Sequence, residues 1–285
     1  MAMATQDAIL AMAEAEEAHV AHVSMNTAGA IMRSEVEAQL DAAHRYKRSV
    51  SKFLHEAMGL ATVTQEVAES CIYSLPRGGK MITGPSVRLA EICASSYGNL
   101  QIGARVVDAE ETEVVAQGAA WDMERNLRCT IEVRRRITDK NGRRYKDDMI
   151  TVTGNAAASI ALRNAIFRVI PRAFVDSVYA KAREVAVGNA KTLETRRQQI
   201  LERFNKLGVS TERVLQRVER KGVEDIDLDD LTVLIGLGTA IKGGEQTIEE
   251  AFPVAAPAPV PPEQDGKRIS MKGKASAQTR EPGED

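Results

Sequence analysis

Period-two alternation of apolar and polar residues predicts three β-strands in the middle of the chain. Leu100–Asp108 and Thr112–Glu124 alternate loosely, and Arg128–Ile137 alternates most regularly. In the third segment the apolar residues face one way and the arginines the other, which is typical of a half-buried antiparallel strand. Small residues around Gly118 share one face of the second segment, where they would let a helix or another backbone approach closely.

Helical spacing of apolar residues dominates the chain before these strands. The predicted helices are Arg33–Met58, ended by Gly59; a helix from the N-cap Thr62 to about Tyr73; and one that opens at Gly84-Pro85-Ser86 and runs through Tyr97. Residues 77–80 between the last two read as a flexible basic loop. This loop is not a nucleotide-binding P-loop, because Lys80 is followed by Met81 and the upstream glycine is missing.

Helices also follow the strands, after a tight turn at Asn141-Gly142. The predicted ones are an alanine-rich helix after Gly154, a helix from Arg172 to about Val187 beyond a bend at Pro171, three short helices over Glu194–Leu207, Ser210–Arg220 and Leu228–Ile241, and one more turn over Thr247–Phe252.

These elements predict an α+β fold with a small antiparallel three-stranded sheet packed on long helices. We expect an N-terminal helical arm over residues 1–60, a core over 61–190, a helical C-terminal module over 191–252 and a disordered Pro/Ala-rich tail over 253–285. The N-terminus lacks the pattern of a signal peptide, and no apolar run is long enough to span a membrane.

Charge is distributed unevenly along the chain, although the net charge is only -2. Met1–Ser70 carries five Lys/Arg against ten Asp/Glu, Cys71–Arg183 carries 18 against 12, and Glu184–Asp285 carries 15 against 18. The positive middle third suits a polyanion-binding surface, or alternatively ordinary solvation. The three cysteines have no metal-ligand spacing and suit a reducing cytoplasm, and we identify no metal or cofactor site.

The basic residues of the middle third are therefore the candidate DNA-binding residues. Arginines of the third strand and of the alanine-rich helix are expected to form two walls of one groove, with Trp121 in the core and Tyr97 or Tyr145 near a base. Guanidinium groups pair well with phosphates. The candidates are Arg77, Lys80, Arg105, Arg128, Arg134, Arg136, Arg143, Arg144, Lys146, Arg163, Arg168 and Arg172. For each arginine, a solvated or carboxylate-paired position is the alternative.

The segments LPRGGKMITGPSVRLAEICASSYGNL and NAAASIALRNAIFRVIP, with three strands between them, resemble phage single-strand annealing recombinases of the RecT/Red-beta superfamily. The resemblance covers roughly Thr62–Val187, and the chain lacks the aromatic-rich turns of some relatives. It implies ATP-independent annealing of complementary strands in phage recombination, rings or helical filaments, and a companion exonuclease in the bacterial cytoplasm. The helices after residue 207 resemble a module that can dock a host single-strand binding protein.

Two other classes of function stay open from the sequence. One is a metal-dependent nuclease, for which Asp122, Glu124 and Glu132 are the candidate carboxylates, although no suitably spaced lysine accompanies them. Salt bridges explain these carboxylates more simply. The other is a structural or adaptor phage protein whose helices only oligomerise. We expect a binding protein without a hydrolytic site.

Overall fold

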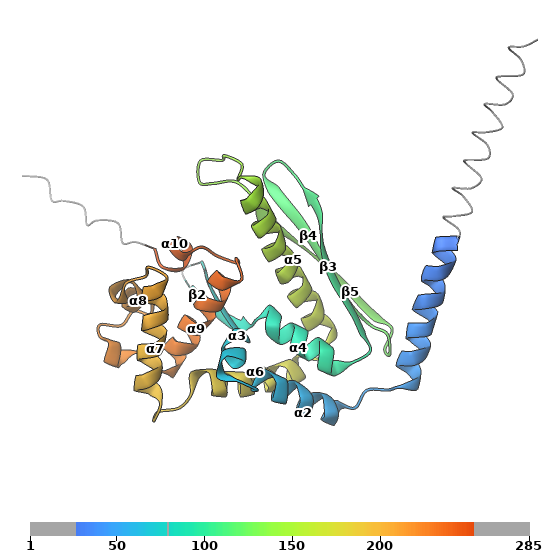
Figure 1. Cartoon of the computed structure of the whole chain (residues 1–285), viewed down its shortest axis with the longest axis horizontal. Helices are drawn as coiled ribbons and strands as arrows, with labels where there is room; N and C mark the ends of the chain where they lie inside the picture. The colour runs from blue at the N-terminus through green and yellow to red at the C-terminus, as the bar shows by residue number, and fades with distance from the viewer. Residues whose placement is uncertain (1–26, 79, 254–285) are drawn as a thin grey trace, which may run out of the picture. The chain divides into compact units, whose positions relative to one another are not determined.

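The computed structural model of the chain describes residues 27–78 and 80–253 (Figure 1). These residues form the predicted α+β fold, with a three-stranded antiparallel sheet packed against helices and a helical C-terminal part. The elements are a helix over 27–45, α2 (Val50–Ala61), α3 (Gln65–Ser70), β1 (Ile72–Arg77), β2 (Lys80–Pro85), α4 (Val87–Tyr97), β3 (Leu100–Ala109), β4 (Glu113–Asp122), β5 (Leu127–Arg136), α5 (Asp147–Val169), α6 (Arg172–Val187), α7 (Leu193–Lys206), α8 (Thr211–Arg217), the 3-10 turn η1 (Val223–Asp225), α9 (Leu228–Lys242) and α10 (Ile248–Ala251). Predictions for 1–26 and 254–285 lie outside the described residues.

The single helix predicted over Arg33–Met58 is wrong, because the chain leaves the helix at residues 46–49 and restarts as α2. Ser49 has an extended backbone and caps α2 by accepting a hydrogen bond from the backbone N–H three residues on. At the same break, the guanidinium of Arg48 pairs with the carboxylate of Asp122 at the end of β4. Periodicity gave no sign of the break, since a partner distant in sequence fixes it.

The predicted helix boundaries around residue 60 also need correction. Gly59 lies inside α2, and Thr62 caps the C-terminus of that helix. The N-cap of α3 is instead Thr64, whose hydroxyl accepts a backbone hydrogen bond. The helix ends at Ser70 rather than near Tyr73, because the chain there turns directly into β1.

A two-stranded hairpin that the sequence pattern does not predict follows α3. β1 and β2 pair antiparallel and bring Arg77 opposite Lys80, so the expected flexible loop is the turn of this hairpin. Ser74 and Thr83 hydrogen-bond across the strands at 2.8 Å. The strands are short and interrupted by proline and glycine, which hides the alternation. Helix α9 packs tightly on the hairpin: a Cβ added to Gly236 would lie 2.6 Å from the backbone nitrogen of Ser74.

The three predicted central strands are confirmed as the sheet β3-β4-β5. Helix α5 crosses one face of this sheet, here called the inner face (Figure 1). The helix is closest at Gly118, where an added Cβ would fall well inside 3.0 Å of the backbone of Ala161. The small residues of β4 therefore admit the helix backbone, as their pattern predicts.

Helix α5 is longer than predicted, because it begins at Asp147 and contains Gly154 in its interior. Two aspartates in the first turn stabilise the positive end of the helix dipole. A Cβ on Gly154 would lie 3.2 Å from the side chain of Val106, so this glycine helps the helix fit against the sheet. The bend at Pro171 and the extent of α6 are as predicted.

The predicted short helices of the C-terminal part are confirmed as α7, α8 and α9, and Ser210 caps α8 as expected. Their buried residues do not form an isolated core. Residues of α3, β1, α6, α7, α9 and α10 pack together, including Ala68, Ile72, Ala186, Ile200, Phe204, Leu234 and Phe252. The expected boundary near residue 190 therefore crosses a continuous hydrophobic core.

A buried ion pair network reinforces this shared core. Glu69 of α3 binds Arg196 at 2.5 Å and also pairs with Arg203, both on α7. Burial opposes ionisation of the Glu69 carboxyl, but hydrogen bonds and charge from the two arginines outweigh it and lower the pKa. Within residues 27–78 and 80–253, no helix combines the length and apolar character that a membrane crossing requires.

The three cysteines are free thiols, and their number and spacing in the sequence do not suggest a disulfide. Cys71 and Cys93 are fully buried in the core between α2, α4, α5 and α6. Burial raises the pKa of each thiol to about 12, which makes both poor nucleophiles at neutral pH.

Candidate nucleic-acid interface

The face of the sheet opposite α5, here called the outer face, is free of any covering helix in the described part of the chain. Strand register defines its members, because alternate residues of each strand point the same way. They are Gln101, Gly103, Arg105 and, beyond a bulge, Asp108 of β3, Glu113, Val115, Gln117, Ala119 and Trp121 of β4, and Arg128, Thr130, Glu132, Arg134 and Arg136 of β5. Four guanidinium groups and three carboxylates thus stand on one open surface.

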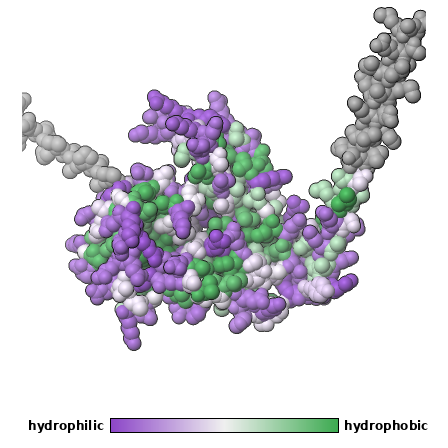
Figure 2. Space-filling model, viewed as in Figure 1, coloured by the Kyte–Doolittle hydropathy of each residue, from purple (hydrophilic) through white to green (hydrophobic). Residues whose placement is uncertain are grey.

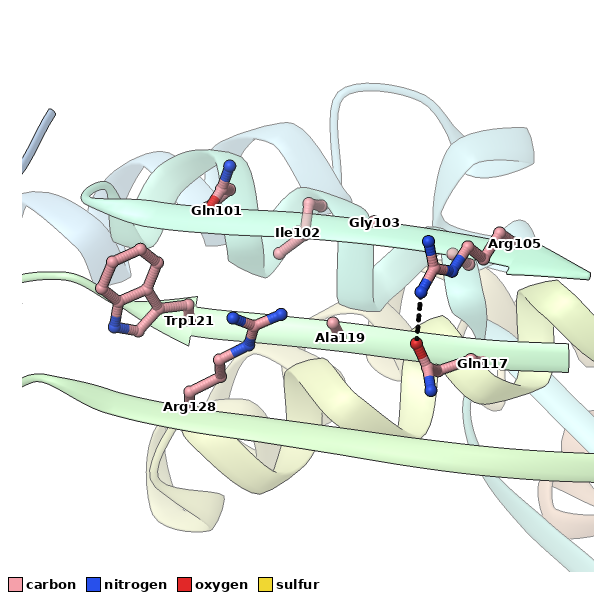
Figure 3. A pocket seen from close by; sticks show the side chains of 9 residues that line it. Gln101, Ile102, Gly103, Arg105, Gln117, Ala119, Trp121 and Arg128 are labelled. Carbon is pink, nitrogen blue, oxygen red and sulfur yellow. Dashed lines mark hydrogen bonds between the residues drawn. The ribbon is translucent and has the colours of Figure 1, made fainter. Parts of the chain in front are cut away.

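A hollow of about 310 Å³ opens on the outer face around Trp121 (Figure 3). The indole lies at one end, and Arg128, its cross-strand neighbour on β5, reaches beside it. The floor is low because Gly103 and Ala119, which pair across β3 and β4, carry almost no side chain. None of the residues that line this hollow is acidic.

Two of the predicted DNA-binding residues belong to this hollow, which is here called the Trp121 hollow. Arg105 donates a hydrogen bond to the side-chain oxygen of Gln117 at 3.3 Å and remains exposed. Arg128 is also exposed and has no hydrogen-bond or ion-pair partner among the described residues. Neither guanidinium is neutralised by a carboxylate, so both are available to an anionic ligand.

The prediction that Trp121 sits in the core is wrong. Its side chain is on the outer face and only partly buried. The physical reason is the close approach of α5 to the middle of β4, where the inner face carries only Ala116, Gly118 and Ala120. Tyr97 is also placed differently from the expectation, since it is buried against Phe53 with Arg48 stacked 3.9 Å above its ring, and cannot touch a base.

The remaining outer-face arginines lie toward the opposite end of the sheet, where more of the charge is paired internally. Arg134 forms ion pairs with Glu110 at 3.1 Å and with Glu113 at 3.9 Å. Arg144 donates hydrogen bonds to the backbone carbonyls of Glu110 and Glu111. Arg136, Arg143 and Lys146 are exposed. This end is strongly hydrophilic (Figure 2) but has less free positive charge than its arginine count suggests.

The expected second wall of the groove does not face the strand arginines. Arg163 of α5 is buried, pairs with Glu245 at 3.5 Å and stacks 4.3 Å from the ring centre of Tyr73. Arg168 and Arg172 are exposed, and Arg172 pairs with Asp176 at 2.7 Å. Because α5 covers the inner face while the β5 arginines point outward, the two sets cannot line one groove. Arg163 was misassigned because its carboxylate partner lies 82 residues further along the chain.

Arg77 and Lys80 are exposed at the turn of the β1-β2 hairpin, which forms a separate sheet from β3-β4-β5. The structure thus collects Arg105, Arg128, Arg134 and Arg136 on one surface, and Arg144 approaches that surface through its bonds to the β3-β4 turn. The hairpin residues and the α5 and α6 arginines belong to other surfaces.

Two of the three carboxylates considered for metal binding are bound by a structural arginine, Arg48. Asp122 is fully buried, and its carboxylate accepts hydrogen bonds from both terminal nitrogens of Arg48. The carboxylate of Glu124 accepts a hydrogen bond from Nε of Arg48 at 3.2 Å. Although burial opposes it, hydrogen bonds from Arg48 and Asn99 lower the pKa of Glu124. Glu132 is on the outer face, apart from them. In the described residues, no group of three or more His, Cys, Asp or Glu side chains is placed to hold a metal ion.

Sequence reasoning missed two features of this region. Arg48 locks the break before α2 to the sheet, and nothing local marks it. The Trp121 hollow was detectable in principle, because Gly103, Ala119 and Trp121 occupy positions that antiparallel pairing brings together. Comparisons with protein-family models, with curated proteins and with solved structures find no match to this chain.

Proposed function

We propose that this protein binds single-stranded DNA on the outer face of the β3-β4-β5 sheet and promotes ATP-independent annealing of complementary strands. The observation that supports the proposal most directly is the pair of exposed guanidiniums, Arg105 and Arg128, that flank a hollow without acidic lining. Phosphate oxygens are the ligands that such groups pair with most favourably.

Contacts to the sugar–phosphate backbone of the DNA suit an annealing protein, because they hold a strand from its charged side. The bases are then mostly left exposed for pairing with a second strand. The annealing step, the rings or filaments, the companion exonuclease and the docking of a host single-strand binding protein rest on the resemblance to RecT/Red-beta recombinases. We propose that the protein acts in the bacterial cytoplasm during phage recombination.

The experiment that tests the proposal measures binding of a labelled oligonucleotide over a range of salt concentrations, with no nucleotide present. The affinity should fall steeply with salt, since phosphate contacts release counterions. In the double variant Arg105→Ala/Arg128→Ala, we expect binding at least about tenfold weaker and a salt slope smaller by about 1.4, at about 0.7 per phosphate contact on single strands.

The matched control is Arg88→Ala/Lys181→Ala, which removes the same charge from two exposed residues paired locally on α4 and α6. This variant should bind and anneal like the wild type. An equal loss in both double variants would show that net charge, not the outer face, governs binding. Cleavage of the oligonucleotide with divalent metal would indicate a nuclease, and absence of binding would favour a structural or adaptor protein.

A further inference from the structure

Trp121 is the single tryptophan of the chain, and it stands on the surface proposed to bind DNA. One side of its indole is open to the Trp121 hollow, whose far end is closed by the hydrogen-bonded pair Arg105 and Gln117 (Figure 3). The space above Gly103 is empty, because a Cβ added there meets no atom within 4 Å. The hollow is therefore a slot beside an aromatic ring, with a floor of small residues.

We propose that this hollow holds one nucleobase of the bound strand, stacked against the indole of Trp121. The inference rests on the proposed function and adds to it a base contact that phosphate binding alone does not require. Arg128 lies beside the indole and supplies a planar guanidinium that can stack on the same base or pair with the adjoining phosphate. A base that enters the hollow would thus meet an aromatic surface and a cation together.

The lining of the hollow predicts little sequence preference. Every nucleobase has a face that can stack, so stacking tolerates any sequence. Gln117 already accepts a hydrogen bond from Arg105 at 3.3 Å and donates one to Glu132 at 3.5 Å, so part of its hydrogen-bonding capacity is taken. Gln101 is the uncommitted amide in the lining, and an amide can donate to one base and accept from another.

One stacked base per protein chain would fix the position of the strand while the neighbouring bases remain unpaired and exposed. Guanidinium contacts alone would let the strand slide, because the phosphates repeat along the backbone. A single aromatic contact holds one base of the strand in place and leaves the other bases exposed. A base stacked on Trp121 would therefore add one localised contact per chain to the phosphate contacts.

The test uses the emission of Trp121, which reports on the hollow without a label. The full-length protein is titrated with an oligo-dT and with an otherwise identical strand whose sugars carry no bases. We expect the oligo-dT to quench the emission and to bind at least about fivefold more tightly than the abasic strand, the low end of what one stacked base contributes. The abasic strand should bind through its phosphates without quenching.

Substitutions at Gly103 test the same slot while leaving the indole in place. Alanine, valine and leucine at this position fill the space progressively, starting from a Cβ that meets no atom within 4 Å. Preference for oligo-dT over the abasic strand should fall with side-chain size, while affinity for the abasic strand should stay constant. Thermal unfolding of each variant confirms that the sheet is intact.

The outcomes separate the base site from the proposed function. Equal affinity for the two strands without quenching, or a preference that survives Gly103→Leu in a folded protein, overturns the base site and leaves phosphate binding in place. If neither strand binds, both proposals fail.

Discussion

Replacing Gly118 by alanine should destabilise the protein more than any other single methyl group added to the sheet. This glycine is at the centre of β4, where the α5 backbone crosses the inner face. An added Cβ would fall far inside 3.0 Å of the carbonyl group of Ala161 and of the nitrogen of the next residue. All of these are backbone atoms of a helix, so no side chain can rotate out of the way.

The cost follows from how far α5 must retreat. Restoring an ordinary contact moves the helix away from the sheet by more than about 0.5 Å, which forfeits a quarter or more of the dispersion energy of each contact affected. The buried face of α5 includes Ala157, Ala165 and Ile166, and the contacts of these residues weaken together when the helix moves. Overpacking of this kind costs about 3 kcal/mol, and the lower entropy of the unfolded alanine chain offsets at most about 1 kcal/mol.

The matched control is Gly103→Ala on the neighbouring strand, where the new methyl group meets no atom within 4 Å. That variant should be as stable as the wild type or more stable by up to about 1 kcal/mol. Urea unfolding followed by circular dichroism measures both free energies. If Gly118→Ala unfolds at the wild-type midpoint, α5 does not lie on β4 as described, and the distinction between inner and outer faces is lost.

Two further predictions concern the buried arginine networks. Arg48→Met removes the charge that neutralises the fully buried Asp122 and should cost about 3 kcal/mol, part of which Arg48→Met/Asp122→Asn should recover in the same urea assay. Glu69→Gln leaves Arg196 buried without a carboxylate and should cost about 3 kcal/mol at neutral pH. Because the folded-state pKa of Glu69 is lowered, its stabilisation is present above its ordinary value of 4.5 and is lost as the pH falls through the folded value. As the pH falls from about 5 through the folded-state pKa of Glu69, the wild type should thus lose more stability than Glu69→Gln. Parallel pH profiles of the two proteins would contradict the role given to the Glu69 ion pairs.

Local patterns predicted those elements whose form depends on their own residues. β4 and β5 alternate because one face of each packs on α5, whereas β3 alternates loosely and is exposed along most of its length. Helix α9 carries its own cap at Asp227 and an apolar sequence. The failures share a different origin. The break at 46–49 depends on Asp122, and the β1-β2 hairpin is held by α9 through the close approach at Gly236. Such contacts join segments far apart in sequence, and no local window contains both partners.

The misplacement of Trp121 has a separate cause, because its correct position was contained in the pattern of β4. Period two puts Trp121 on the face opposite Gly118, and a face of glycine and alanine is the one that admits a helix backbone. The large ring must then be on the other face, whatever the general tendency of tryptophan to be buried. Arg163 shows the converse, since a polar residue at helical spacing was assigned to the surface although Glu245 neutralises it inside. The space available along a strand therefore predicts the position of an aromatic residue better than its hydrophobicity does. The position of a charged residue on a helix, by contrast, cannot be predicted until its ion-pair partner is known.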